Sequence, residues 1–519
     1  MGKRYYIGFD CGTMGTKVGI YTDEGNTVSE AYREHVILYP KPGWAEMEAD
    51  QFYRVVVDGI RECLTKGEVP ADEVGGISCS GIICGFVPID AAWKPLGPYI
   101  PYLDGRAQKE ALALKDAEPL WAEESGNADV GAYMPPVIIK WVLANMPEVK
   151  KNVRKVVTGA QYVMGKFGGL GAKDAFIDWA HLSGWVIGFD ARKRNWSERQ
   201  IEILGLPDTI LPRVVKPWDV IGKLSAEEAK ILGLKPGVPL VAGGGDIMQS
   251  CLGSGMTEKG ISIDVAGTAS ILTFAVSGID PVITQKRVLV NAMYTLDDLY
   301  FLWGFIPAGG LSLRWYRDEV YGKPGDSEIY RELDKLAAKV PPGSDFSMFF
   351  PFLQGRSSPF WPTASGAWLG LRGSNQMGHL WRSMMESIAF EYLIWTSLLR
   401  NEGIAVNQMI GTGGGSNSRL WNQMKADMMN LEYMIPARSE GAVLGNALLA
   451  AYGVGAVKDL RKTIKEWVTI KETFRPKPEV TSFYQRMAKV REEILNGPLL
   501  DCFNRIQSLH DKIVPPSNG

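Results

Sequence analysis

The sequence predicts an α/β protein with two large domains. Its 519 residues exceed the roughly 250–300 residues that one hydrophobic core supports. Strand-like runs lie near the N-terminus and runs with helical spacing lie in the C-terminal half, so both kinds of element are expected. One strand–loop–strand pattern also occurs twice, at residues 5–22 and 260–278, which favours a duplicated architecture.

The composition narrows the class of protein. Hydrophobic residues make up 46% and charged residues 22%, as in folded soluble domains. A net charge of −2 without a long Lys/Arg block argues against nucleic acid or an anionic membrane as the main partner. The basic cluster at 149–155 is expected on a solvated helix face.

The longest apolar run, at 77–89, is too short for a membrane span and is expected to be a buried strand. Since no signal peptide is seen, we expect a cytoplasmic protein.

The cysteines and histidines predict neither a disulfide framework nor a metal centre. The six cysteines form no CxxC pair, and the four histidines lack the spacing of metal ligands. We therefore expect reduced thiols and no structural zinc site.

The first strands are expected to form an antiparallel meander. The runs "YYIGFD", "KVGIYT" and "TVSEAYREHVI" are separated by the loop "CGTMGT" and the turn "DEGN". The P-loop and the dinucleotide-binding loop instead open a helix after a strand. Neither GxxxxGK[ST] nor GxGxxG occurs in this chain, so both of those phosphate sites are excluded.

The run "GISIDVAGTASILTFAVSG" repeats this pattern, with an aspartate at a strand end and a Gly-Thr pair in the following turn. The matching residues are Asp10, Gly12 and Thr13 in the first copy and Asp264, Gly267 and Thr268 in the second. Two phosphate-binding hairpins, one per half, are the favoured interpretation, and a coincidence between two Gly-Thr hairpins is the alternative.

The remaining segments suggest the domain limits. The apolar run "VPLVAGGGDIMQSCLGSG" ends near Met256, so we expect an N-terminal domain at 1–255, a C-terminal domain at 256–475 and a helical tail at 476–519. The last residues, "VPPSNG", are expected to be frayed.

Three C-terminal segments are expected to be helical. "HLWRSMMESIAFEYLIWTSLL" has the apolar spacing of a core helix, and "GAVLGNALLAAYGVG" is a Gly- and Ala-rich helix suited to close packing. "MIGTGGGSNSRLWNQMKADMMNLEY" predicts a strand, a glycine loop and a helix capped near Ser416 or Ser418.

The first hairpin has the groups that a phosphate site needs. Backbone N–H groups near Gly12 and the hydroxyls of Thr13 and Thr16 can surround phosphate oxygens, and Lys17 can add positive charge. Asp10 would repel phosphate directly, so we expect it to hold a hydrated Mg²⁺. Asp264 is a second candidate for the metal.

Asp246 differs from these two aspartates because three glycines precede it. We expect the glycines to leave open backbone for a bulky ligand. A carboxylate there is suited to accept the proton of a substrate hydroxyl that attacks a phosphoryl group. A plain turn aspartate after a strand is the alternative.

Together these motifs carry a family resemblance. The chain resembles a sugar kinase of the FGGY carbohydrate kinase family, most closely its xylulokinase branch, within the actin, hexokinase and Hsp70-like ATPase superfamily. The resembling motifs are "GFDCGTMGTK", "GGGD", "IDVAGTAS", "PAGGLSLRWYRD" and "GTGGGSNSRLWNQMKAD", in the family's order.

The resemblance implies two RNase H-like domains, each with a five-stranded sheet, that close on ATP in a central cleft. It implies Asp246 as general base, Asp10 near Mg²⁺, phosphate contacts from Thr13, Gly267 and Thr268, a nucleotide-side loop at Gly310, and adenosine contacts at Gly414, Gly415 and Ser418.

The chain departs from the family where the acceptor would bind. Ile82, Ile83 and Cys84 stand where xylulokinases usually carry Gln-Met-His, and Ile247 follows the catalytic aspartate where Asn or Gln is usual. Losing hydrogen-bonding groups is expected to change substrate preference. Asp104 keeps the family's Asp-Gly-Arg motif, and it either faces the pocket or caps a helix.

We therefore expect an ATP-dependent, xylulokinase-like enzyme that phosphorylates a hydroxyl of a small ketose or polyol. Its partners are the sugar or polyol, ATP and Mg²⁺, and a homodimer is left open. One alternative is a family member for a non-pentose, such as a tetritol, a hexulose or a small dihydroxy ketone. The other is an actin- or Hsp70-like ATPase without sugar kinase activity.

Overall fold

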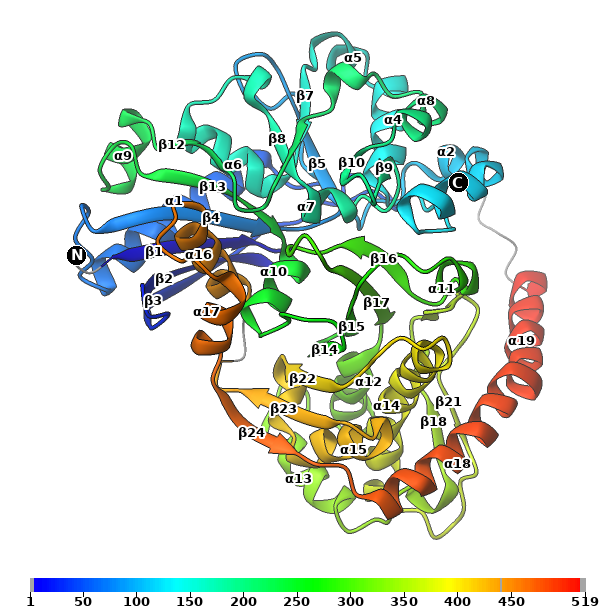
Figure 1. Cartoon of the computed structure of the whole chain (residues 1–519). Coiled ribbons are helices and arrows are strands. Elements are labelled where there is room, and N and C mark those ends of the chain that lie inside the picture. Colours follow the sequence, from blue (N-terminus) through cyan, green and yellow to red (C-terminus); the bar gives the residue numbers. More distant parts are fainter. Residues whose placement is uncertain (1–3, 439–440, 514–519) are drawn as a thin grey trace.

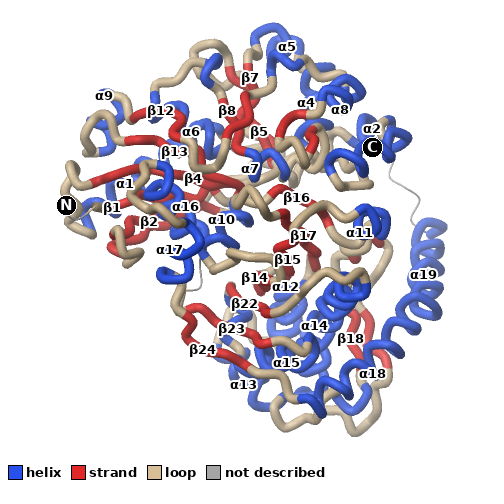
Figure 2. Tube along the Cα trace, viewed as in Figure 1, coloured by secondary structure: helices blue, strands red, loops and turns tan. Residues whose placement is uncertain are grey.

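Two mixed β-sheets, one from each half of the sequence, organise the protein (Figures 1 and 2). The structure is a computed structural model that describes residues 4–438 and 441–513. Figure 2 shows the sheets in the middle of the two lobes with most helices around them. The expected α/β class with two lobes is confirmed.

The first sheet has the strand order β12-β13-β4-β1-β2-β3. Its strands are β1 (Tyr5–Cys11), β2 (Gly15–Thr22), β3 (Thr27–Glu34), β4 (Val74–Gly81), β12 (Val220–Lys223) and β13 (Pro239–Gly245). Strands β1, β2 and β3 are antiparallel, which confirms the predicted meander, whereas β4 and β13 run parallel to β1. The carboxyl ends of β1, β4 and β13 therefore meet at one edge of the sheet.

The second sheet repeats this arrangement with the order β16-β17-β15-β14-β22-β23-β24. Its strands are β14 (Ile261–Ala266), β15 (Ser270–Val276), β16 (Val290–Met293), β17 (Tyr300–Ile306), β22 (Gln408–Thr412), β23 (Glu432–Pro436) and β24 (Ile470–Phe474). Here β17, β15 and β14 are antiparallel, and β22 and β23 run parallel to β14. The equivalent strand orders support duplication rather than a coincidence between hairpins. Both sheets exceed the five expected strands, because β12 extends the first and β16 and β24 extend the second.

Helices cover both faces of the first sheet. Ile7 and Phe9 of β1 pack with the core around α1 (Ala49–Lys66) and α6 (Gly159–Gly168), whereas Tyr6 packs with the core around α16 (Ala442–Gly453). A strand buried on both faces is expected to be apolar nearly throughout, and β1 is buried at every position except the partly buried Asp10.

Helix α16 comes from the C-terminal half of the sequence but packs on the first sheet (Figure 1). A Cβ atom added at Gly8 would lie 2.1 Å from the carbonyl oxygen of Val443, so the backbones of β1 and α16 approach closely. The predicted limit between residues 255 and 256 stays a prediction, and the segment 442–453 contributes to the first lobe.

The predicted C-terminal helices are present. Helix α14 is Met377–Asn401, and α15 is Arg419–Met429 with Ser418, not Ser416, as its N-cap. The tail forms α18 (Pro478–Ile494) and α19 (Leu500–Ile513), while the "VPPSNG" segment lies outside the described residues.

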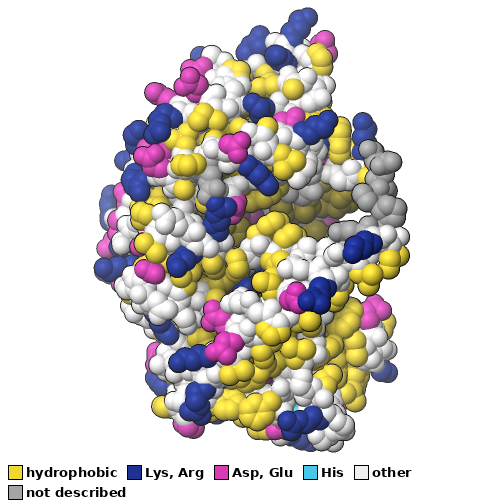
Figure 3. All heavy atoms as spheres, turned by 90° about the vertical axis from the view of Figure 1, so that its right-hand side faces the viewer, with side chains coloured by type: hydrophobic (Ala, Val, Ile, Leu, Met, Phe, Trp, Pro, Cys, Tyr) yellow, Lys and Arg dark blue, Asp and Glu magenta, His cyan; other side chains and the backbone are white. Residues whose placement is uncertain are grey.

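The longest apolar run of the sequence is buried in the first lobe. Residues 77–89 contribute two buried strands, β4 and β5 (Gly85–Ile89), rather than one. Over residues 4–438 and 441–513, no helix combines the length and apolarity that crossing a membrane requires. Figure 3 shows hydrophobic side chains over much of the lower part of one face, and Ile506, Leu509 and Ile513 of α19 are exposed.

Candidate active site

Three parallel strands of the first sheet end at the candidate site. Strand β1 ends just after Asp10, β4 ends at Gly81, and β13 ends at Gly245. Cys11 is opposite Gly81, and Gly81 is opposite Gly245, so the three ends are in register. Open α/β sheets bind their ligands outside the carboxyl ends of their strands. The register brings together Asp10, the turn after β4 and Asp246, which are far apart in the sequence.

The first hairpin turn, between β1 and β2, differs in detail from the expectation. Burial raises the pKa of Tyr102, a residue that the sequence analysis did not single out, and its nearness to the Thr13 hydroxyl offsets part of that rise. Lys17 is opposite Asp10 in the β1–β2 register. Thr16 is buried, and its Oγ1 lies 2.9 Å from Nε2 of His35. That placement argues against the predicted phosphate contact of Thr16, because its hydroxyl is already used inside the lobe.

Asp246 is the first residue of helix α10 (Asp246–Gly253) and is partly buried. Its Oδ1 accepts a hydrogen bond from the backbone N–H of Ile247 at 2.8 Å. Burial, together with the negative charge of Asp10, raises the pKa of Asp246 to about 8. A carboxylate with a pKa near neutrality is a stronger proton acceptor than an ordinary aspartate, so Asp246 is suited to general base catalysis.

The three glycines before Asp246 serve packing rather than ligand access. Gly243 has φ +86°, in the left-handed region that favours glycine. Cβ atoms added at 243–245 would lie 1.9 Å from the Cys79 carbonyl oxygen, 2.2 Å from Nε2 of Gln249 and 2.3 Å from Cγ2 of Ile83, respectively. The expectation of open backbone for a bulky ligand is wrong here, because neighbouring protein atoms fill that space.

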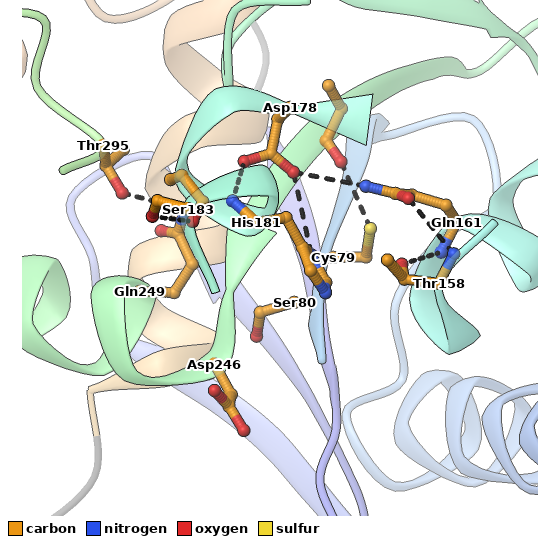
Figure 4. A network of polar contacts seen from close by, with 12 residues as sticks. Cys79, Ser80, Thr158, Gln161, Asp178, His181, Ser183, Asp246, Gln249 and Thr295 are labelled. Carbon is orange, nitrogen blue, oxygen red and sulfur yellow. Dashed lines mark hydrogen bonds and ion pairs between the residues drawn. The ribbon is translucent and has the colours of Figure 1, made fainter. Parts of the chain in front are cut away.

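A buried polar network lies behind the turn after β4 (Figure 4). Asp178 caps α7 (Trp179–Ser183) by accepting from the backbone N–H of His181 at 2.8 Å, and Gln161 Nε2 donates to it at 3.3 Å. His181 Nε2 lies 3.0 Å from the carbonyl oxygen of Ile82. Burial lowers the pKa of His181 to about 4, so the ring is neutral near pH 7 and donates from Nε2 to this carbonyl.

The sequence analysis missed this network. Asp178 directly before a short helix, three residues ahead of His181, is an N-cap pattern that could have indicated it. Burial also raises the pKa of Asp178 to about 8.

The turn that departs from the family pattern lies between β4 and β5. Ile82 and Cys84 are buried, and Ile83 is partly buried. The thiol of Cys84 donates to the carbonyl oxygen of Gly184, and burial raises its pKa, so it stays protonated. Ile247 is partly buried as well.

Asp104 is not a helix N-cap, because the next helix, α2 (Gln108–Ala113), has Ala107 at that position. Asp104 is 1% exposed and accepts from the backbone N–H of Ala45 at 2.7 Å. It also pairs with Arg106, whose Nε lies 2.8 Å from Oδ1. The helix-cap alternative is therefore wrong, and a role in acceptor binding stays a prediction.

The second hairpin, between β14 and β15, is supported by helix α12 (Gly309–Trp315). The backbone N–H of Gly310 donates to the Gly267 carbonyl at 3.1 Å, and that of Leu311 donates to the Thr268 carbonyl at 2.8 Å. A Cβ atom at Gly310 would lie 2.2 Å from the Gly267 carbonyl oxygen. Gly310 thus fixes the hairpin that corresponds to the turn at Gly12.

The glycine loop after β22 runs beside this hairpin, since β22 and β14 pair in parallel. A Cβ atom at Gly414 would meet nothing within 4 Å, whereas one at Gly415 would lie 2.7 Å from the Ala266 side chain. Ser418 caps α15 and donates to Oδ2 of Asp334 at 2.6 Å. Gly414 is therefore the open position of this loop, and the other two are used in packing and capping.

Asp264 is placed away from solvent, in contrast to Asp10. It is completely buried, pairs with Lys425, and accepts from the hydroxyls of Tyr433 at 2.7 Å and Tyr392 at 2.6 Å. This placement argues against the predicted metal contact of Asp264, because cation and hydroxyl donors already use its oxygens. Over the described ranges, no group of three or more His, Cys, Asp or Glu side chains is arranged to hold a metal ion.

Comparisons with known proteins agree with this geometry. Residues 5–253 match the N-terminal domain, and residues 265–454 the C-terminal domain, of the FGGY family of carbohydrate kinases. The chain is 26% identical to a xylulose kinase of Staphylococcus epidermidis over 95% of this chain and 97% of that protein. It is also 26% identical to a gluconokinase of Bacillus subtilis over 87% of this chain and 88% of that protein.

A solved structure gives the same result. The crystal structure of xylulose kinase from Rhodospirillum rubrum superposes with a TM-score of 0.87 at 25% identity, covering 96% of this chain and all of that one, 100%. Two family domains that together span most of the chain, on two duplicated sheets, identify the activity class. The chain belongs to the FGGY family of carbohydrate kinases and is an ATP-dependent sugar kinase.

Proposed function

We propose that this kinase transfers the γ-phosphoryl group of ATP to a hydroxyl of a small, uncharged ketose or polyol, with Asp246 as the general base. The observation that carries the proposal is the strand edge that Asp246 shares with Asp10, where burial and the negative charge of Asp10 raise the pKa of Asp246 to about 8. The carboxylate takes the proton of the acceptor hydroxyl as its oxygen bonds to the γ-phosphorus. The bond from that phosphorus to the bridging oxygen breaks, and ADP leaves.

The phosphates are proposed to lie between the two hairpin turns. Backbone N–H groups near Gly12 and the hydroxyls of Thr13 and Thr268 are suitable donors, and Lys17 supplies positive charge. Gly267 shapes the second turn in this proposal, because its own N–H donates to the carbonyl oxygen of Ala269 at 3.1 Å. The adenosine is proposed to lie at the glycine loop, where Gly414 has open space on its Cβ side. Gly310, Gly415 and Ser418 act in this proposal by shaping the nucleotide side.

Mg²⁺ is proposed to bind beside Asp10. Asp10 is partly buried at a strand end, and a single carboxylate oxygen donor suits a metal that otherwise keeps water and phosphate ligands. When bound, the ion neutralises negative charge on the transferred phosphoryl group. Asp264 is left out, since Lys425 already neutralises it.

The acceptor is proposed to be uncharged and to present an apolar side. The charges that act on Asp246 and on Cys84 come from Asp10 and Asp246, respectively, so both influences are negative. A sugar acid would add a further negative charge. The partly buried side chains of Ile83 and Ile247 favour an acceptor with fewer hydroxyl groups than xylulose, which keeps the non-pentose alternative in place.

A coupled assay of ADP release tests the proposal. Wild-type protein is assayed with ATP and Mg²⁺ against ketoses, polyols and sugar acids, and Asp246→Asn is assayed in parallel. We expect turnover with uncharged acceptors, and its loss in Asp246→Asn with ATP binding intact. Unchanged turnover in the variant, or a preference for sugar acids, contradicts the assignment.

Two further expectations stay predictions. A homodimer is supported by the exposed apolar side chains Ile506, Leu509 and Ile513 on α19 and is tested by analytical ultracentrifugation. A cytoplasmic location is supported by the ordinary composition and is tested by cell fractionation.

A further inference from the structure

Helix α16 brings one polar side chain into the interior of the first lobe. Its buried residues are apolar apart from Asn446. The Asn446 side chain is completely buried, 0% exposed, between the helix and the first sheet. An amide in such a place needs an explanation, because an apolar side chain would avoid the cost of removing polar atoms from water.

The Asn446 amide begins a chain of hydrogen bonds that ends on Asp10. Its Nδ2 donates to the carbonyl oxygen of Phe9 at 2.8 Å and to Oγ of Ser80 at 2.7 Å. A carbonyl oxygen can only accept, so the nitrogen must face Phe9 and the orientation of the amide is fixed. Ser80 in turn donates to Oδ1 of Asp10 at 2.7 Å.

The direction of this chain follows from the chemistry of the serine hydroxyl. The hydroxyl of Ser80 has a single proton, and Asn446 approaches it as a donor. The proton must therefore point elsewhere, and Asp10 is the acceptor that it meets. Asn446 thus makes Ser80 a donor toward the carboxylate, which fixes the position of Oδ1 of Asp10.

Helix α16 packs closely against α10, which fixes the position of Asn446 relative to the site. A Cβ atom at Gly445 would lie 2.6 Å from the Gln249 carbonyl oxygen, and one at Gly253 would lie 2.0 Å from the Gly441 carbonyl oxygen. These close approaches seat α16 against α10, the helix that begins at Asp246. One helix therefore contacts both segments that carry the catalytic carboxylates.

The oxygen of the Asn446 side chain, unlike its nitrogen, has no hydrogen-bond partner among the described residues. Oδ1 of Asn446 accepts no hydrogen bond from residues 4–438 or 441–513. Buried polar atoms without partners are rare and gather where function requires a particular side chain.

We propose that Asn446 is a positioning residue that holds the Asp10 carboxylate, through Ser80, in the orientation that receives the Mg²⁺–nucleotide. The inference rests on the proposed place of Mg²⁺ beside Asp10. Figure 4 shows Ser80 between the buried polar network and Asp246, so the middle residue of the relay lies close to the general base. A helix from the C-terminal half of the sequence would thereby set the geometry of the first phosphate hairpin.

The test compares nucleotide binding with and without the metal. Isothermal titration calorimetry gives the Kd of ADP in Mg²⁺ and in EDTA for wild type, Asn446→Ala, Asn446→Leu, Ser80→Ala and the double variant Ser80→Ala/Asn446→Ala. Leu448→Ala is the control. Leu448 is a buried residue of the same helix, and its apolar side chain takes no part in the hydrogen bonds that link Asn446, Ser80 and Asp10. Asn446→Leu keeps the side-chain volume and guards against a loss of folding in Asn446→Ala.

We expect both Asn446 variants to reduce the Mg²⁺-dependent gain in ADP affinity about tenfold, as removal of a partner behind a metal ligand typically does. Metal-free ADP binding and the KM of the acceptor should stay within about twofold. The Mg²⁺ concentration for half-maximal rate should rise in parallel, and the double variant should lose little beyond Ser80→Ala, because one relay carries both effects.

Three results would overturn the inference, and a fourth would overturn the proposed function. A wild-type Mg²⁺ gain in both Asn446 variants overturns the inference, as does an equal loss of metal-free ADP binding or an equal loss in Leu448→Ala. A wild-type protein that phosphorylates no acceptor overturns the proposed function instead. The two failures are therefore distinguishable.

Discussion

Lys425 and Asp264 form an ion pair in which both side chains are 0% exposed, beneath the second hairpin. The ammonium group also lies 4.0 Å from the centre of the Trp421 ring, and the carboxylate accepts from the hydroxyls of Tyr392 and Tyr433. Because Asp264 is on β14 and Lys425 is on α15, the pair joins the hairpin strand to the helix that follows the glycine loop.

Removing the cation should be costly. Lys425→Met leaves the carboxylate of Asp264 buried with its hydroxyl donors alone, and breaking a buried pair in this way costs about 3–5 kcal/mol. Urea unfolding measures the change in the free energy of unfolding. Arg419→Met on the same helix is the control, since Arg419 is exposed and its ion pair with the partly buried Glu472 lies at the surface, where such a pair contributes about 0–1 kcal/mol. Similar, small losses in both variants contradict the structural role of the buried pair.

The partly buried carboxylate of Asp246 should lower the free energy of unfolding of the wild-type protein near pH 8. Its folded pKa of about 8 lies above the unfolded value, so its contribution to stability is present at low pH and is lost as the pH rises toward 8. Asp246→Asn should therefore be more stable than wild type at pH 8, by about 1–3 kcal/mol given about 1.4 kcal/mol for each unit of pKa shift.

The stability difference should also depend on pH. Calorimetry of the two proteins at pH 5, 6.5 and 8 should show an advantage of Asp246→Asn that grows with pH. Asp178, which has a similarly raised pKa, is present in both proteins and cancels in the difference. An advantage that does not change with pH, or a less stable variant at pH 8, contradicts the assignment of the raised pKa to Asp246.

The sequence was sufficient for the fold because its signals are local. Each hairpin is a strand, a Gly-Thr turn and a strand within about twenty residues, and the apolar runs of the strands and of α14 have clear periods. Asp10 and Asp246 were predicted because each directly follows a strand core. Their closeness required only the rule that parallel strands end at one edge.

The residues that support the site could not be predicted, because their contacts join segments that are far apart in the sequence. Lys425 contacts Asp264 across 161 residues, and Asn446 contacts Ser80 across 366 residues, so no local pattern marks either pair. The glycines at 243–245 were misread because a glycine serves close packing as readily as ligand access. Thr16 follows the alternation of β2, which turns its side chain into the lobe toward His35.

His181 should support the turn at Ile82 through its hydrogen bond. Its folded pKa of about 4 lies below the unfolded value, so its contribution to stability is present above about pH 6.5 and is lost as the pH falls toward 4. His181→Ala should lower the free energy of unfolding at pH 7.5 by about 2–4 kcal/mol, because it leaves a cavity and an unpaired carbonyl.

His181→Gln keeps an N–H donor and should lose less than the alanine variant at pH 7.5. It should also be less sensitive to acid than wild type, since the group that titrates has been removed. Chemical unfolding at pH 7.5 and 5 checks both points. Equal losses in the two variants would mean that the hydrogen bond to Ile82 contributes nothing measurable.

Ile247 should influence which acceptor is used. It is partly buried in the first turn of α10, and its backbone N–H, not its side chain, holds Asp246. Ile247→Asn adds a donor and an acceptor without removing that bond. We expect the ratio of kcat/KM between a fully hydroxylated ketose and a deoxy or branched analogue to rise at least about tenfold, because an unpaired amide penalises the apolar analogue.

The control for Ile247→Asn is Ile394→Asn, a substitution of another partly buried isoleucine, on α14 in the second lobe. Both variants exchange a partly buried apolar side chain for an amide, so both should lose some stability, and the first should change acceptor preference while the second should not. Kinetics over one panel of acceptors, together with thermal unfolding, separate the two effects. If Ile247→Asn lowers kcat/KM by the same factor for every acceptor, the side chain affects catalysis or folding but does not select the substrate, and the apolar side of the proposed pocket must be assigned to other residues.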